Sequence, residues 1–126
     1  MRVLLDTAIL IFAVESPERL SARARSVLEN PKNVLELSSI SLAEIAIKAS
    51  LGKLRFSAAM VREAIAELGI RVLPFTAEHA FHLFSLPLHH RDPFDRQIVA
   101  QALAEKIPVV TSDQEFGLYQ GINVVW

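Results

Sequence analysis

The stretch Val3-Leu4-Leu5-Asp6-Thr7 decides how the chain begins: a short apolar run ends abruptly at an acid. Apolar side chains with helical spacing follow directly, at Ile9, Phe12 and Ala13. A short apolar run that leads into such spacing is typical of a buried strand followed by a helix. The stretch therefore predicts the first unit of an α/β sheet, with Asp6 at the carboxyl end of its first strand.

Short apolar runs and helical segments alternate along the rest of the chain. Serine, threonine and aspartate caps indicate where helices begin, and glycine indicates where two of them end. We expect further strands at 34–37, 70–75, 109–110 and 122–125. We expect helices, caps included, at 18–29, 41–51, 57–69, 76–86 and 92–106, and a helical turn at 112–116. Short apolar strands separated by helices predict a parallel sheet covered on both faces, a three-layer α/β/α sandwich. We assign residues 1–126 to one such domain.

Length and composition agree with a single folded domain. The chain has 126 residues, 52% of them hydrophobic, and its mean hydropathy of +0.33 excludes intrinsic disorder. Its net charge of −1 argues against bulk electrostatic binding of nucleic acid. The absence of cysteine excludes disulfide scaffolds, cysteine zinc sites and thiol catalysis. The early apolar run 8–14 is far shorter than the ~20 residues of a membrane helix, so we expect a soluble cytoplasmic protein.

Aspartate is rare in this sequence and is placed at junctions between elements. Asp6 and Asp113 each follow an expected strand, and Asp92 and Asp95 begin the long helix that precedes the second of these strands. Ligands of open α/β sheets bind beyond the carboxyl ends of the strands. We therefore expect all four aspartates to converge at one edge of the sheet.

Glu44 is a fifth acid that the pattern places toward the interior. It lies with Ile40, Ile47 and Leu51 at helical spacing, so we expect it within an apolar stripe. Two carboxylates ~5 Å apart repel by about 3 kcal/mol at an effective dielectric near 20, so a cluster of several requires a cation. Oxygen ligands alone favour Mg²⁺, or Mn²⁺, and such ions typically activate a water against a phosphodiester.

Four of the five acids also have a purely structural interpretation. Asp92 is a good N-cap before a proline, and Asp95 in the first helical turn would favour the helix dipole. Asp113 follows Ser112 in what resembles a capping box, and Glu44 has Lys48 four residues on, as in a helical ion pair. Asp6 has no such explanation.

Four segments in this order resemble a known family. They are Val-Leu-Leu-Asp-Thr (3–7), Ser-Ile-Ser-Leu-Ala-Glu-Ile (39–45), His-His-Arg-Asp-Pro-Phe-Asp-Arg (89–96) and Val-Val-Thr-Ser-Asp (109–113). Together they are similar to PIN-domain ribonucleases, most of all to the VapC-type toxins of type II toxin–antitoxin systems. The resemblance spans the whole chain.

The resemblance implies a function and assigns roles to residues. It implies an Mg²⁺-dependent endoribonuclease that hydrolyses RNA phosphodiester bonds, a cognate antitoxin as partner, and a homodimer. The catalytic, metal-binding acids would be Asp6, Glu44, Asp95 and Asp113. Further residues would support them: Asp92 as a neighbour of the metal ligands or as a helix cap, and Thr7 and Thr111 as polar positions that hold carboxylates or the attacking water.

Basic and aromatic residues give weaker signals. Arg96, directly after Asp95, is the first candidate for contact with RNA phosphates, and Arg91 is the second. His89 and His90 are adjacent and lack a histidine four residues away, so we expect no histidine metal site. The high apolar content suggests a groove between helices that takes an amphipathic segment of the antitoxin.

Two other functions compete with a nuclease. A receiver-like signalling domain has a similar length, but it would need a second acid beside Asp6 and a lysine after Val110, and both are missing. A non-catalytic PIN-like binding module would remain if the acids did not converge.

Overall fold

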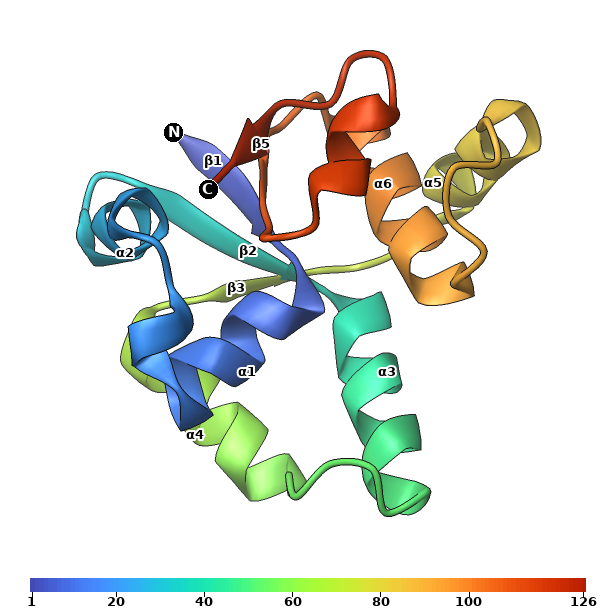
Figure 1. Cartoon of the computed structure of the whole chain (residues 1–126). Coiled ribbons are helices and arrows are strands. Elements are labelled where there is room, and N and C mark those ends of the chain that lie inside the picture. Colours follow the sequence, from blue (N-terminus) through green and yellow to red (C-terminus); the bar gives the residue numbers. More distant parts are fainter.

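Five parallel strands form the central sheet of the computed structural model, which describes residues 1–126 (Figure 1). They are β1 (Arg2–Leu5), β2 (Val34–Ser38), β3 (Arg71–Leu73), β4 (Val109–Val110) and β5 (Val124–Val125). Their order in the sheet is β3-β2-β1-β4-β5. Receiver domains have the order 2-1-3-4-5, so this topology excludes the receiver-like alternative.

Helices cover both faces of the sheet. They are α1 (Thr7–Glu15), α2 (Ala22–Glu29), α3 (Ser39–Ser50), α4 (Ala58–Leu68), α5 (Ala77–Phe81) and α6 (Pro93–Glu105), with 3-10 helices η1 (Pro17–Arg19), η2 (His82–Ser85) and η3 (Gln114–Leu118). Val3 and Leu5 point to one face, into a core shared with α1, α2, α3 and α4. Leu4 points to the other face and packs against α6 and η3. The predicted three-layer α/β/α sandwich is confirmed.

Several predicted boundaries were wrong. The helix predicted to be capped by Ser41 begins earlier: Ser38 is its N-cap and accepts a hydrogen bond from the backbone N–H of Ile40. The predicted helix 18–29 is divided into η1 and α2, because Ser21 caps a new helix. Asp113, and not Ser112, caps the helical turn η3.

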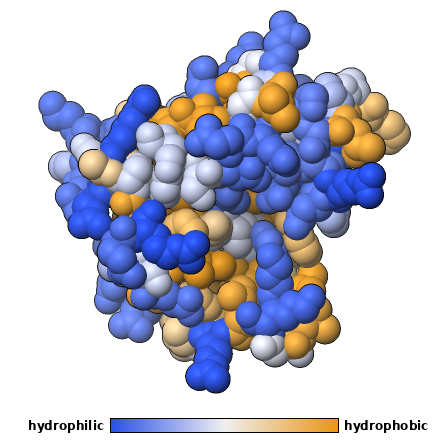
Figure 2. Space-filling model, viewed as in Figure 1, coloured by the Kyte–Doolittle hydropathy of each residue, from blue (hydrophilic) through white to orange (hydrophobic).

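Some large apolar side chains remain at the surface. Figure 2 shows apolar surface in the lower half of the molecule, where Figure 1 places α3 and α4. A groove of about 550 Å³ lies between these two helices, and most of its lining is hydrophobic. Phe81 and Phe84, near α5, are 62% and 88% exposed. No helix is long and apolar enough to cross a membrane.

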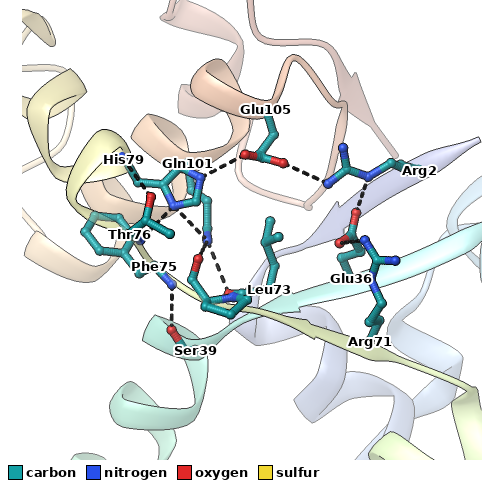
Figure 3. A network of polar contacts seen from close by, with 11 residues as sticks. Arg2, Glu36, Ser39, Arg71, Leu73, Phe75, Thr76, His79, Gln101 and Glu105 are labelled. Carbon is teal, nitrogen blue, oxygen red and sulfur yellow. Dashed lines mark hydrogen bonds and ion pairs between the residues drawn. The ribbon is translucent and has the colours of Figure 1, made fainter.

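A network of ion pairs joins the carboxyl end of α6 to the sheet (Figure 3). Glu36, in the centre of β2, is completely buried and binds the guanidinium groups of Arg2 and Arg71. Arg2 also binds Glu105 of α6 at 2.9 Å, and Glu105 binds the buried His79 at 3.0 Å. The other ring nitrogen of His79 accepts a backbone N–H, so its Nε2 carries the proton and donates it to Glu105. These contacts fix α6, whose opposite end carries Asp92 and Asp95.

Candidate functional site

The candidate site lies where the strand order reverses. Strands β2 and β3 lie on one side of β1, and the later strands β4 and β5 lie on its other side. Ligands of open α/β sheets bind at such a point, beyond the carboxyl ends of the adjacent strands. Asp6 directly follows β1 and Thr111 directly follows β4. The first turns of α1, α3 and α6 lie around this edge (Figure 1).

Asp6 is a buried carboxylate with a single side-chain hydrogen bond. Its Oδ2 accepts from Oγ1 of Thr111 at 2.8 Å, and its exposed fraction is 7%. Burial raises the pKa of Asp6 to about 6, and the charges of Glu44 and Asp113 act in the same direction, whereas the Thr111 hydroxyl opposes them. Thr111 thus holds the Asp6 carboxylate through its hydroxyl.

Asp95 lies in the first turn of α6 and is half-buried. Burial raises the pKa of Asp95 to about 7, with further increases from the charges of Asp6 and Asp92, while His90 opposes them. Asp92 is the N-cap of α6: its Oδ1 accepts from the backbone N–H groups of Phe94 and Asp95, at 2.8 and 3.2 Å. The structural interpretation of Asp92 as a helix cap is therefore confirmed, and its negative charge also acts on Asp95.

Glu44 is buried on α3, but the reason predicted for its burial was wrong. Ile47 and Leu51 of the predicted apolar stripe are 47% and 63% exposed, and the buried face of α3 carries Ser41, Glu44 and Ile45. One oxygen of Glu44, Oε2, pairs with the ammonium group of Lys48. The other oxygen, Oε1, is buried and has no hydrogen-bond partner.

Asp113 is held by His90, for which the sequence predicts no role in the site. Nε2 of His90 lies 3.0 Å from Oδ2 of Asp113 and 3.6 Å from Oε2 of Glu115. Because an ionised carboxylate can only accept, Nε2 of His90 carries a proton, and in the neutral ring Nδ1 accepts from the Tyr119 hydroxyl at 2.9 Å. No local pattern indicated this pair, since its two partners are 23 positions apart in the chain.

The predicted acids face one region without forming a closed set of ligands. Asp6, Glu44 and Asp95 interact through their charges, and Asp113 acts on Asp6. The one set of three potential metal ligands whose atoms all lie within 4.8 Å of one another is His90, Asp113 and Glu115. The acids at this edge are thus electrostatically coupled, but no three of Asp6, Glu44, Asp95 and Asp113 lie as close together as His90, Asp113 and Glu115 do.

The three remaining predicted residues, Thr7, Arg96 and Arg91, differ in their contacts and exposure. Thr7 is buried, and its hydroxyl donates to Oγ of Ser41 at 2.8 Å, so its side chain connects α1 with α3. Its backbone N–H donates to the Asp6 carboxylate. Arg96 donates to the backbone carbonyl groups of Leu86 and Pro87, so its guanidinium group braces the loop before α6. Arg91 is exposed in that loop.

Comparisons with known proteins agree with the fold. The family model of the PIN domain matches residues 3–121, so this chain belongs to the PIN-domain family, and the resemblance noted in the sequence is confirmed. No curated protein sequence matches the chain. VapBC2 from Rickettsia felis, bound to a promoter DNA fragment, is similar in structure, with a TM-score of 0.76, 20% identity and coverage of 98% of this chain and 97% of that chain. DNA-bound VapBC from Salmonella typhimurium has a TM-score of 0.69, 23% identity and coverage of 98% and 96%.

Proposed function

We propose that this protein is an Mg²⁺-dependent endoribonuclease that acts as the toxin of a type II toxin–antitoxin system. One observation carries the proposal: buried and half-buried acids gather at the sheet edge with too few cations to balance them. Asp6 and Asp95 have no ion-pair partner, and the pKa of each is raised to about 6 and 7, respectively. Membership of the PIN family supports this function. The segments in which the sequence resembles PIN-domain ribonucleases carry Asp6, Glu44, Asp95 and Asp113.

A divalent metal ion fits the residues present. The unpartnered, buried Oε1 of Glu44 is the kind of orphaned acceptor that a cation satisfies. Asp6, Glu44 and Asp95 would hold the ion, with Asp113 as a further ligand directly or through water. These are oxygen donors, which favour Mg²⁺ or Mn²⁺. When bound, the ion supplies Lewis acidity and water activation for phosphodiester hydrolysis.

The chain's own residues would prepare this chemistry. Thr111 orients Asp6 by donating to Oδ2 and accepts the backbone N–H of Asp113 at 3.0 Å, so it fixes both acids relative to β4. His90 orients the Asp113 carboxylate. The backbone N–H groups at the start of α6 are already bound by Asp92, so Asp95 is free to turn its carboxylate toward Asp6.

The groove between α3 and α4 suits the antitoxin. An amphipathic helix or extended segment binds such a surface through its apolar side chains. The groove contains one cation, Arg62, beside nine hydrophobic residues, which would accept an apolar segment with an acidic group. Solved structures similar to this chain include a toxin–antitoxin complex from Klebsiella pneumoniae and a member of the VapBC family of toxin–antitoxin systems from Mycobacterium tuberculosis, which supports a partner of this kind.

A homodimer is the assembly we propose. Phe81 and Phe84 stack with ring centroids 6.2 Å apart and remain largely exposed, and Leu88, four residues after Phe84 in the chain, is exposed as well. An apolar patch of this kind on a small domain favours association with another protein surface. Sedimentation of the purified protein would measure this, and a Phe84→Ser variant should shift a dimer toward the monomer.

Cleavage of a structured RNA by the purified protein tests the central proposal. We expect cleavage with Mg²⁺, loss of cleavage with EDTA, and loss of cleavage in the Asp6→Asn variant. Glu63→Gln, which alters an exposed acid on α4, is the matched control and should cleave like the wild type. Equal activity in all these samples would contradict a metal-dependent site at Asp6, and absence of cleavage throughout would favour a non-catalytic PIN-like module.

A further inference from the structure

Lys48 is the one lysine that forms an ion pair with the acids of the site. Its Nζ binds Oε2 of Glu44, one helical turn earlier on α3, and its side chain is 38% exposed. Glu44 is 6% exposed in its side chain, and its second oxygen has no partner. The ion pair therefore satisfies one oxygen of the buried Glu44 carboxylate, Oε2, and leaves Oε1 without a hydrogen-bond partner.

The surroundings of Lys48 extend beyond this pair. The hydrogen bond to Glu44 is the main factor that raises the pKa of Lys48, burial opposes it, and the charges of Asp92 and Asp95 raise the pKa further. The ammonium group therefore faces carboxylates from both α3 and the first turn of α6. Asp6 and Asp95 themselves have no ion-pair partner, so Lys48 is the main resident cation on this side of the cluster.

We propose that Lys48 is a built-in counter-ion that a divalent metal ion must displace from Glu44. This inference rests on the proposed metal-dependent function. A divalent cation held by Glu44 would lie within a few ångströms of the ammonium group, and like charges at that separation repel strongly. Lys48 can respond because more than a third of its side chain already contacts solvent and its stem is flexible. Lys48 would thus stabilise the metal-free site and weaken metal binding to it.

Mn²⁺ binding to the intact protein, measured by calorimetry at pH 8, tests this. Lys48→Met keeps the length of the side chain and removes its charge, so we expect Mn²⁺ to bind about 5-fold more tightly or better. In EDTA the same variant should melt at a lower temperature than the wild type, because Glu44 loses its partner, and Mn²⁺ should raise its melting temperature by more. Lys48→Arg, which keeps the charge, should bind Mn²⁺ within about 3-fold of the wild type.

Lys32→Met is the matched control, because it removes one positive charge from an exposed loop at the opposite edge of the sheet. It should leave Mn²⁺ affinity within about 2-fold of the wild type. If Lys48→Met binds Mn²⁺ equally or more weakly while the wild type binds Mn²⁺ and cleaves RNA, the counter-ion role is wrong and the proposed function stands. If Lys48→Met does not fold, equal Mn²⁺ affinities of Lys48→Arg and the wild type support the inference, and a large loss in Lys48→Arg overturns it. If the wild type neither binds Mn²⁺ nor cleaves RNA, the proposed function itself fails.

Discussion

Replacing Asp6 by asparagine should remove nuclease activity. In the absence of metal, the variant should also gain stability relative to the wild type as the pH rises from acidic to neutral. The pKa of Asp6 is raised from 3.8 to about 6 in the folded protein. A raised pKa means that the folded state holds its proton more tightly than the unfolded chain does. The stabilisation of the folded state that comes from the protonated Asp6 is fully present below pH 3.8 and is lost as the pH rises through about 6.

The size of the effect follows from this shift. One pKa unit corresponds to about 1.4 kcal/mol, so ionised Asp6 lowers the free energy of unfolding by about 3 kcal/mol at pH 7.5. At pH 4.5 the folded state keeps its proton while most unfolded chains have lost theirs, and the loss is about 1 kcal/mol. The amide of the Asp6→Asn variant does not titrate, so the variant should gain about 2 kcal/mol relative to the wild type between these two pH values. Any constant effect of the buried amide cancels in this difference.

Urea unfolding in EDTA at both pH values measures the gain directly. Glu63→Gln, at an exposed position of α4, should change the free energy of unfolding by less than about 0.5 kcal/mol at either pH. A difference between Asp6→Asn and the wild type that is the same at pH 4.5 and pH 7.5 would refute the argument, because Asp6 would then have an ordinary pKa in the folded protein.

Three further predictions concern the site and its support. Metal binding requires both Asp6 and Asp95 to be ionised, and their pKa values are about 6 and 7. The affinity for Mn²⁺ should therefore rise with pH and level off above about 7.5. Calorimetry that shows a constant affinity from pH 5 to 8 would contradict this. His90→Gln should reduce the rate of RNA cleavage by about 10-fold or more, because Asp113 loses the group that orients it; an unchanged rate would show that this contact is not needed. Glu36→Gln should lower the free energy of unfolding by about 2 kcal/mol in urea titrations and leave the cleavage rate of the folded protein unchanged; a loss of activity without a loss of stability would contradict a purely structural role.

The fold could be predicted from the sequence because most of its strands and helices have a local signal, either a short apolar run or a capping residue. Burial of Leu4, Leu5, Val109 and Val110 follows from short apolar runs, and Ser57 caps α4 as its sequence suggests. The start of α3 could not be predicted in this way, because Ser38 and Ser41 are both suitable caps. The choice depends on how far β2 pairs with β3, which is a property of the assembled sheet.

The candidate site could be predicted in part for the same reason. The positions of Asp6 and Asp113 follow from the carboxyl ends of β1 and β4, which sequence alone locates. The contacts of His90 and Arg96 could not be predicted, because their partners come from other parts of the chain. Glu44 was selected for a wrong reason: its neighbour Ile47 is exposed, and the buried face of α3 that carries Glu44 also carries Ser41.

Two buried acids of this protein, Glu36 and Asp6, differ in whether the chain supplies positive charges to balance them. Glu36 has no exposed surface, yet both of its oxygens are bound by guanidinium groups from neighbouring strands. Asp6, on the same sheet, receives one side-chain hydrogen bond, from a neutral hydroxyl, and faces other carboxylates. A chain that supplies Arg2 and Arg71 to one buried acid has the means to neutralise another. The absence of such a partner for Asp6 supports our proposal that a cation from outside the chain balances its charge.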